Sequence, residues 1–382
     1  MSFIFLNIIV AIFSLNLTHA SEFPQPKEEQ FKHSLAFWVQ IYTQYDTRQG
    51  IIHDSEYLDK VYEIIDLSTT TARQAKKLIS QSKRKWKKVL LELAKRKEDL
   101  GVLSKEEEHV FRLFPPSMGK ARFKEAALGS RMRFQLGQKD QFSSAIKMSG
   151  KYLSYMEEVF RNEGLPIELS RIPFIESSFN LKARSKVGAS GIWQFMPSTG
   201  KLFMKINAYV DERNDPIIAT LAAARLLKQN YESLNSWPLA ITAYNHGRNG
   251  MMNAVKKTGL TDFENLISNH KNRKFGFASK NFYWEFLAAL EVEKNKDKYF
   301  PKIIKEEMIS YVPVTFEKPV SILKLAELLD ITRIELKEYN PGFKDSVWLG
   351  RLKVPKKYPI KIPKKIVDKN KNFLINLENK IK

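Results

Sequence analysis

The chain has 382 residues, a hydrophobic content of 43%, 16 Gly, 16 Pro and a net charge of +21. This length and composition indicate a globular protein of about two to three domains and exclude a disordered chain. The sequence holds no cysteine, which excludes disulfide bonds, thiol catalysis and a lipid-modified N-terminal cysteine. The excess of basic residues predicts acidic partners, either nucleic acid or anionic polymers and membrane surfaces.

The first twenty residues differ from the rest of the chain. Residues 3–17 are almost wholly apolar, and Ala20 ends the run with a small side chain. The run is too short to span a hydrocarbon layer of about 30 Å comfortably, so we interpret residues 1–20 as a secretory signal. No Lys or Arg precedes it, which leaves a buried N-terminal helix or an uncleaved anchor as the alternative. We therefore expect an exported protein in the periplasm or cell envelope of a bacterium.

Residues 21–119 are predicted to form an N-terminal helical region. From residue 56 to about residue 114 apolar residues recur at intervals of three and four, beginning with Val61, Ile64 and Ile65, and Pro115 and Pro116 end the pattern. The densest basic run, residues 83–88, lies within this amphipathic pattern. A solvated helix face is favoured there over a dedicated binding patch.

Residues 120–302 are predicted to form a second, mostly helical domain with few strand signals. Pro166 suits the first turn of a helix, and Pro173 is expected to kink or end that helix just before Glu176. Asp215 and Pro216 begin another helix, which continues to about Tyr231.

In residues 308–356 the pattern of apolar residues changes and predicts a small strand–helix–helix–strand module. A strand is expected at residues 311–316, helices at 321–329 and 334–339, and a closing strand at 352–355. Residues 357–382 are Lys-rich and predicted to be a solvated tail. The fold class expected for the whole chain is mainly α, with one small α+β module.

Glu176 is the residue most suited to chemistry. It is an isolated acid in apolar company, between Phe174 and Ile175 on one side and Phe179 on the other. Burial disfavours the charged form of a carboxyl group, so such a residue can act as a general acid near neutral pH. A capping or ion-paired glutamate is the structural alternative. Downstream, Trp193 and Gln194 offer an aromatic surface and an amide, which a sugar carrying an N-acetyl group needs.

Three motifs in fixed order resemble the catalytic domain of family-1 lytic transglycosylases. They are Glu176-Ser177, the run Gly-Ile-Trp-Gln-Phe-Met-Pro at residues 191–197, and Ala-Tyr-Asn-His-Gly at residues 243–247. The resemblance is to the membrane-bound lytic murein transglycosylase D subgroup, whose domain is similar to goose-type lysozyme, and it covers about residues 120–295. Together the motifs are highly specific, although none is so alone.

The resemblance implies a role for each matching position. Glu176 would be the single acid/base, and Ser177 would help to orient it or the substrate. Gln194 would hold an N-acetyl group of the glycan, and Tyr244 and Asn245 would line the catalytic subsite. The remaining implied substrate-binding residues are Gly191, Ile192, Trp193, Phe195, Met196 and the late aromatic Tyr283.

The implied reaction cleaves the bond between N-acetylmuramic acid and N-acetylglucosamine of peptidoglycan without water and leaves 1,6-anhydromuramoyl ends. One carboxylate suffices because the substrate's own N-acetyl group assists. No metal or cofactor is expected. A hydrolytic muramidase on the same fold is the alternative, and a non-catalytic peptidoglycan-binding protein is another. A nucleic-acid binder is disfavoured by the export signal and the lack of a recognition motif.

The module at residues 308–356 resembles a LysM domain, on the strength of residues 311–314, Tyr339-Asn340-Pro341 and residues 349–355. Where that family usually has Gly-Asp-Thr, this chain has Lys318-Pro319-Val320. The departure leaves two interpretations open: a glycan-binding module, or a structural module that does not bind.

Overall fold

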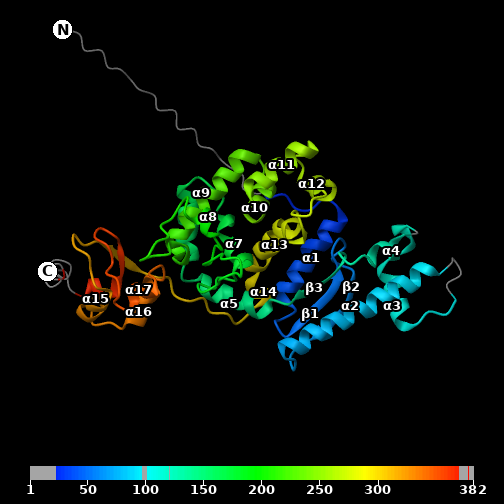
Figure 1. Cartoon of the computed structure of the whole chain (residues 1–382), viewed down its shortest axis with the longest axis horizontal. Helices are drawn as coiled ribbons and strands as arrows, with labels where there is room; N and C mark the ends of the chain where they lie inside the picture. Colours follow the sequence, from blue (N-terminus) through cyan, green and yellow to red (C-terminus); the bar gives the residue numbers. More distant parts are fainter. Residues whose placement is uncertain (1–22, 97–100, 120, 370–376, 378–382) are drawn as a thin grey trace, which may run out of the picture.

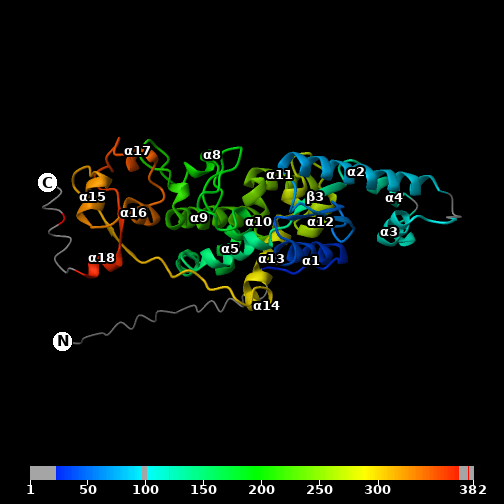
Figure 2. The same ribbon diagram turned by 90° about the horizontal axis from the view of Figure 1, so that it is seen from below.

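The computed structural model describes residues 23–96, 101–119, 121–369 and 377. The described chain is elongated, with a strand-and-helix region at one end, a helical body in the middle and a small module at the other end (Figures 1 and 2). Helices dominate, as the mainly α prediction states. The signal predicted at residues 1–20 lies outside the described residues. Of the helices in the described part, none combines the length and apolarity that crossing a membrane requires.

The first helix belongs to the helical body and not to a separate N-terminal region. Helix α1 (Glu29–Thr43) packs along α13 (Phe277–Lys294), where Trp38 Nε1 donates to Asn281 Oδ1 over 3.2 Å. Phe31 stacks on Trp284 with ring centroids 5.2 Å apart. The predicted boundary near residue 120 therefore does not separate two independent units, because helices from both sides share one hydrophobic core.

Strands from both sides of residue 120 form one sheet. Strand β1 (Gln49–Asp54) pairs antiparallel with both β2 (Val61–Asp66) and β3 (Met132–Leu136), giving the order β2-β1-β3. The helix predicted around Val61, Ile64 and Ile65 is wrong. In this short run, rich in β-branched residues, Tyr62 and Ile65 are buried and Ile64 is half exposed. That pattern fits a strand as well as a helix face, and pairing with β1 selects the strand.

Helix α2 (Ala72–Lys95) packs on this sheet, and α3 (Lys105–Leu113) contacts β2. Helix α4 (Arg122–Ala126) packs on α2, and the 3₁₀ turn η2 (Pro116–Met118) lies between α3 and α4 in the chain. They form a second core around Trp86 and Phe114. The basic run divides between two flanks of α2. Lys85 pairs with Glu106 and Lys88 with Glu92, whereas residues 83, 84 and 87 line a shallow groove beside α4 and β3.

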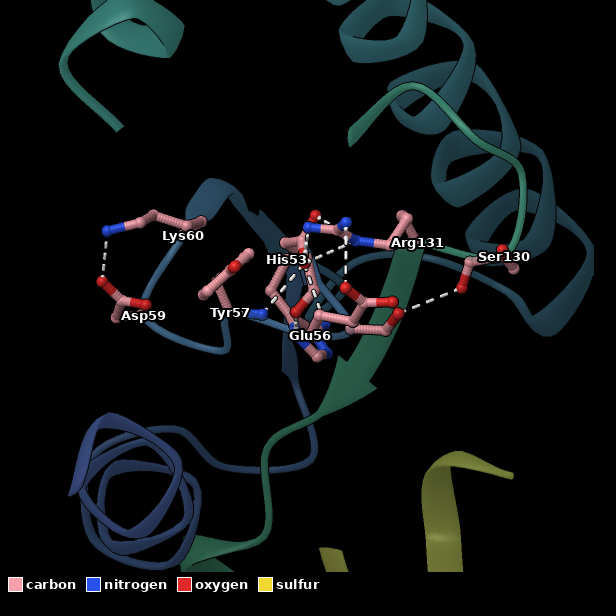
Figure 3. Close-up of polar contacts among 9 residues, drawn as sticks. His53, Glu56, Tyr57, Asp59, Lys60, Ser130 and Arg131 are labelled. Carbon is pink, nitrogen blue, oxygen red and sulfur yellow. Dashed lines mark hydrogen bonds and ion pairs between the residues drawn. The ribbon is translucent and has the colours of Figure 1, made fainter. Parts of the chain in front are cut away.

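A buried ion pair joins the last residue of β1, Asp54, to Arg131, which directly precedes β3 and is labelled in Figure 3. The Arg131 guanidinium donates to both carboxylate oxygens of Asp54 over 2.8–3.0 Å, and Asp54 also accepts the backbone N–H groups of Glu56 and Tyr57. Burial is the largest influence on Asp54 and raises its pKa, although Arg131 opposes the shift. Burial lowers the pKa of the adjacent His53 to about 4, so its imidazole is neutral.

The helical body follows β3 and surrounds the core that holds Trp193 and Phe174. Asp215 accepts from the N–H groups of Ile217 and Ile218 and caps the helix predicted to begin there. The remaining elements are α5 (Lys139–Ser149), α6 (Leu153–Asn162), η3 (Ile167–Arg171), α7 (Ile172–Glu176), α8 (Pro197–Gly200), η4 (Glu212–Asn214), α9 (Pro216–Leu234), α10 (Trp237–His246), α11 (Arg248–Thr258), α12 (Phe263–Asn269) and α14 (Lys296–Tyr299).

The C-terminal module contains β4 (Tyr311–Val314), α15 (Ile322–Leu328), α16 (Arg333–Tyr339), α17 (Asp345–Trp348), β5 (Ile360–Pro363) and α18 (Lys364–Asp368). The closing strand is β5 and not residues 352–355, since β4 pairs with residues 360–363. Val354 makes only an isolated bridge to Val320. The module therefore extends beyond the predicted end at residue 356, and residues 357–368 are not a solvated tail. Ile360 and Ile362 are buried in its core.

Candidate active site

Glu176 is the last residue of α7, a helix of only five residues with Pro173 in its first turn. The side chains of Ile172 and Phe174 are fully buried and fix the helix in the body of the protein. Beyond Glu176 the chain turns sharply, because Ser178 and Phe179 both have positive φ values, 51° and 54°. Non-glycine residues with positive φ are strained and are often found at functional sites, so this turn holds the end of α7 at an energetic cost.

The carboxyl group of Glu176 borders an open cleft of about 720 Å³. One wall is the chain from Ile175 to Lys182, and the other is α5 with the residue before it. From that second wall come Gln138, Asp140, Gln141, Ser144 and Met148. No sequence motif marks these residues, so they were not among the predicted site residues. Their polar groups lie where a chain of hydroxyl-bearing sugars could contact them.

Glu176 is a partly buried acid without a partner. Among the residues that the structure describes, its carboxyl group makes neither a hydrogen bond nor an ion pair. Burial raises the pKa of Glu176 to about 8. The carboxyl group is therefore protonated at neutral pH, which a general acid requires.

Side chains from neighbouring segments hold the loop at residues 188–196 by hydrogen bonds to its backbone carbonyl groups. Ser177 Oγ donates to the carbonyl of Ile192 over 2.8 Å, and the Tyr244 hydroxyl donates to the carbonyl of Trp193 over 2.8 Å. Gly191 has φ +77°, and a Cβ there would lie 1.8 Å from the Arg213 carbonyl oxygen. Only glycine fits this close approach. Ser177 thus joins the end of α7 to the loop and makes no hydrogen bond to Glu176.

Gln194 is placed by an unusual backbone conformation, with φ +48°. Its amide Nε2 donates to the carbonyls of Gly191, over 2.7 Å, and of Ala183, over 3.3 Å. Within the described part of the chain, its Oε1 accepts no hydrogen bond. The side chain is therefore oriented by its nitrogen and leaves its oxygen as a free acceptor.

Three side chains of the same motif are not available to a ligand. Ile192, Trp193 and Phe195 are 0–3% exposed. The Trp193 ring packs on Phe160, and its Nε1 donates to Thr220 Oγ1 over 3.0 Å. The aromatic surface that the sequence analysis expected from Trp193 is therefore wrong, and the motif contributes backbone carbonyls and a fixed loop. Met196 is the exposed apolar residue, at 37%.

Tyr244 and Asn245 lie in the last turn of α10. Burial, and secondly the charge of Glu176, raises the pKa of Tyr244. Asn245 is exposed, and its Oδ1 accepts from Ser279 Oγ over 3.1 Å. His246, to which the sequence analysis assigned no role, lies beside Ser279, and burial lowers its pKa.

Tyr283 is not part of this cleft. Its ring is 1% exposed and packs against Phe263, and its hydroxyl donates to the carbonyl of Pro24 over 2.9 Å. The substrate-binding role expected from the resemblance is therefore wrong for this residue. Tyr283 fixes the segment before α1 to the helical body.

Glu285, two residues later on α13, is a second acid that the sequence analysis missed. Helix α13 packs against α7, and burial, followed by the charge of Glu176, raises the pKa of Glu285 to about 8. As with Glu176, no hydrogen bond or ion pair to another described residue holds its carboxyl group. The signal that identified Glu176 would have found it, because Glu285 is an isolated acid between Trp284 and Phe286.

Residues 145–267 match the model of the transglycosylase SLT domain. The chain is 29% identical over 219 residues to membrane-bound lytic murein transglycosylase D of Escherichia coli strain K12, which covers 54% of this chain and 47% of that protein. It is 30% identical over 173 residues to a protein of Alteromonas sp. strain M-1 named for tributyltin chloride resistance, covering 43% of this chain and 78% of that one.

The chain thus spans about half the length of the Escherichia coli relative that it matches. Among solved structures it is similar to an inactive mutant of the lytic transglycosylase Slt from Pseudomonas aeruginosa. The sequence identity is 19% and the TM-score 0.34, over 61% of this chain and 35% of that one.

Proposed function

This chain belongs to the transglycosylase SLT domain family, and from that premise we propose that it is a lytic transglycosylase acting on peptidoglycan. The observation that carries the proposal is Glu176, a protonated, unpartnered carboxyl group at the edge of an open cleft. A non-catalytic glycan-binding protein has no need of a buried acid, because such a group costs stability unless it performs chemistry.

In the proposed reaction Glu176 acts twice. Its proton passes to the glycosidic oxygen between N-acetylmuramic acid and N-acetylglucosamine, the bond from that oxygen to C1 breaks, and the leaving sugar departs as an alcohol. The N-acetyl carbonyl of the muramoyl residue stabilises the positive charge at C1. The Glu176 carboxylate then takes the proton of the C6 hydroxyl, whose oxygen bonds to C1 and closes the 1,6-anhydro ring. The acid is restored without water.

The surrounding residues would hold the glycan against this acid. Gln194 Oε1 is free to accept the N–H of an acetamido group, since its nitrogen is already bound within the loop. Tyr244 and Asn245 would line the subsite next to Glu176, and Ser177 would keep the loop at a fixed distance from the acid through its bond to Ile192.

One observation favours a second candidate function. A hydrolytic muramidase needs a base for water, and paired carboxyl groups are the usual solution in glycosidases. Glu285 is a second carboxyl group close enough to Glu176 for their charges to interact. Its raised pKa argues against this role, because a group protonated at neutral pH is a poor base.

The products decide between the two functions. The purified protein would be incubated with isolated sacculi, and the soluble muropeptides would be identified by mass spectrometry. Formation of 1,6-anhydromuramoyl ends, lost in Glu176→Gln, is the expected result. Reducing muramic acid ends, heavier by one water, would show a hydrolase. Binding to sacculi without any release would show a non-catalytic protein.

The proposed substrate sets the expected location, the bacterial cell envelope, and makes glycan strands the principal partner. The net charge of +21 would favour peripheral contact with anionic membrane or wall polymers. Secretion of the full-length chain, followed by N-terminal sequencing of the mature protein, would test both export and cleavage after Ala20.

A further inference from the structure

We infer that the C-terminal module is a fixed part of the catalytic unit and positions the loop at residues 188–195 for glycan binding. This inference rests on the proposed function for what the loop binds. It assigns the module a role other than that of a wall anchor on a flexible tether. Lys361 and Tyr358 are its positioning residues.

The module is joined to the helical body by backbone pairing. Asp211 N–H donates to the Gly342 carbonyl over 2.8 Å, and Lys344 N–H donates to the Tyr209 carbonyl over 2.9 Å. Val210, between them, forms an antiparallel bridge with Phe343 and belongs to the hydrophobic core of the module. The segment before α9 is thus shared by the two parts.

Side chains of β5 and of the residues just before it strengthen this junction. The Lys361 ammonium group pairs with Asp215, and the two side chains are 10% and 6% exposed. The Tyr358 hydroxyl donates to Glu212 Oε1 over 2.9 Å. Both partners lie at the start of α9, Asp215 as its N-cap and Glu212 in the 3₁₀ turn before it.

Residues 211–215, which the module contacts, also hold the loop at residues 188–195. Arg213 is fixed by a two-pronged ion pair with Asp211, over 2.8 and 2.9 Å. Its Nη1 then donates to the carbonyls of Gly188, over 2.8 Å, and Phe195, over 2.9 Å, which are the two ends of the loop. A displacement of residues 211–215 would therefore move both ends of the loop that carries Gln194.

Helix α9 provides a second connection between the module and the loop at residues 188–195. Asp215 caps its first turn, and Thr220 in the next turn accepts the indole N–H of Trp193, in the middle of the loop. Lys361 thus acts on the loop through the residue that begins this helix. A charged pair this deeply buried is costly to separate, so the module cannot swing freely as a tethered domain would.

The test compares Lys361→Met with Lys365→Met. Lys365 also pairs with a carboxylate, Glu335, but on the surface, with side-chain exposures of 63% and 30%. Each variant would be assayed for KM and kcat on peptidoglycan, and amide hydrogen exchange of residues 188–196 would be followed by mass spectrometry. Lys361→Arg is the conservative variant, and Tyr358→Phe serves if Lys361→Met does not fold.

We expect Lys361→Met to raise KM roughly tenfold, the equivalent of one hydrogen bond to the glycan, with little change in kcat. Exchange at residues 188–196 should accelerate. Tyr358→Phe should give a smaller change in the same direction, Lys361→Arg should recover most of the loss, and Lys365→Met should behave as wild type. A merely destabilised protein would lose active molecules, and so kcat, at constant KM.

Unchanged KM and unchanged exchange in Lys361→Met and Tyr358→Phe would overturn the inference. The exchange measurement does not depend on turnover. If the wild-type protein does not cleave peptidoglycan, the proposed function fails, while the coupling of module to loop is still decided by exchange alone.

Discussion

Two sites in this protein bury carboxyl groups in opposite ways. In the strand region Asp54 accepts hydrogen bonds from the Arg131 guanidinium and from two backbone N–H groups. In the helical body, where α7 meets α13, Glu176 and Glu285 have no such partner. A satisfied buried charge holds a fold together, whereas an unsatisfied one keeps its proton and stays ready to transfer it. The contrast separates structural acids from the catalytic candidate.

The largest effect is expected from removing Arg131, the partner of Asp54. Arg131→Met leaves a buried carboxylate without its cation, which should lower the free energy of unfolding by about 3–5 kcal/mol. Urea unfolding followed by circular dichroism measures it. Arg48→Met, which removes the exposed pair with Asp46, is the control and should cost less than about 1 kcal/mol. Equal losses in the two variants would contradict a special role for the buried pair.

The next effect concerns the loop beside the unpartnered acid. Gly191→Ala combines a left-handed backbone, costing about 1–2 kcal/mol, with a Cβ only 1.8 Å from the Arg213 carbonyl oxygen. The loop must shift, so KM for peptidoglycan should rise by more than about tenfold. Gly188→Ala shares the backbone strain but meets nothing closer than Pro197 at 3.8 Å. A similar KM in both variants would show that close approach at Gly191 does not position the loop.

A third prediction follows from the pKa of Glu176. Because burial raises its folded-state pKa to about 8, the folded protein binds this proton more tightly than the unfolded chain does. The stabilising contribution is complete below about pH 4.5 and is lost as the pH rises towards 8. Glu176→Gln should remove about 1–2 kcal/mol of this pH dependence, reduced from the full value because Glu176 is partly exposed. The free energy of unfolding in urea would be measured for the wild type and the variant at pH 5 and pH 9. The same change between the two pH values in both proteins would argue against a raised pKa of Glu176.

The smallest effect should come from the second acid. Glu285→Gln removes a negative charge that opposes ionisation of Glu176, so the pKa of Glu176 should fall. The alkaline limb of the kcat/KM profile, expected near pH 8, should move to lower pH by roughly half a unit. Glu291→Gln, on an exposed position of α13, is the control. If the alkaline limb of the kcat/KM profile stayed at the same pH in Glu285→Gln, the two carboxyl groups would titrate independently.

Much of the site could be predicted because its chemistry is local in the sequence. An acid between apolar neighbours indicates a raised pKa, and positions 215–216 indicate a helix start, whatever the rest of the fold does. The errors concern residues with two possible environments. Trp193 and Tyr283 belong to motifs and carry aromatic rings, but the rings pack in the core. A motif specifies that a residue matters, and it does not specify which of its atoms faces the ligand.

The fold errors have a similar cause. Val61, Ile64 and Ile65 suit a helix or a strand, and pairing with β1, which precedes them in the chain, selects the strand. The closing strand of the C-terminal module was misplaced because residues 352–355 have a strand-like pattern, whereas residues 360–363 lie in a Lys-rich segment that was predicted to be a solvated tail. Pairing with β4 selects the second.

The sequence by itself determined the mainly helical class, the acid at Glu176 and the choice of Gln194 as a candidate beside it. These depend on the chemistry of single residues and their neighbours. Only the tertiary structure decided that Glu285 joins Glu176, that Trp193 faces the core, and that Lys361 of the last module pairs with Asp215. Each of these is a contact between distant segments, and packing of the whole chain, not local pattern, brings such segments together.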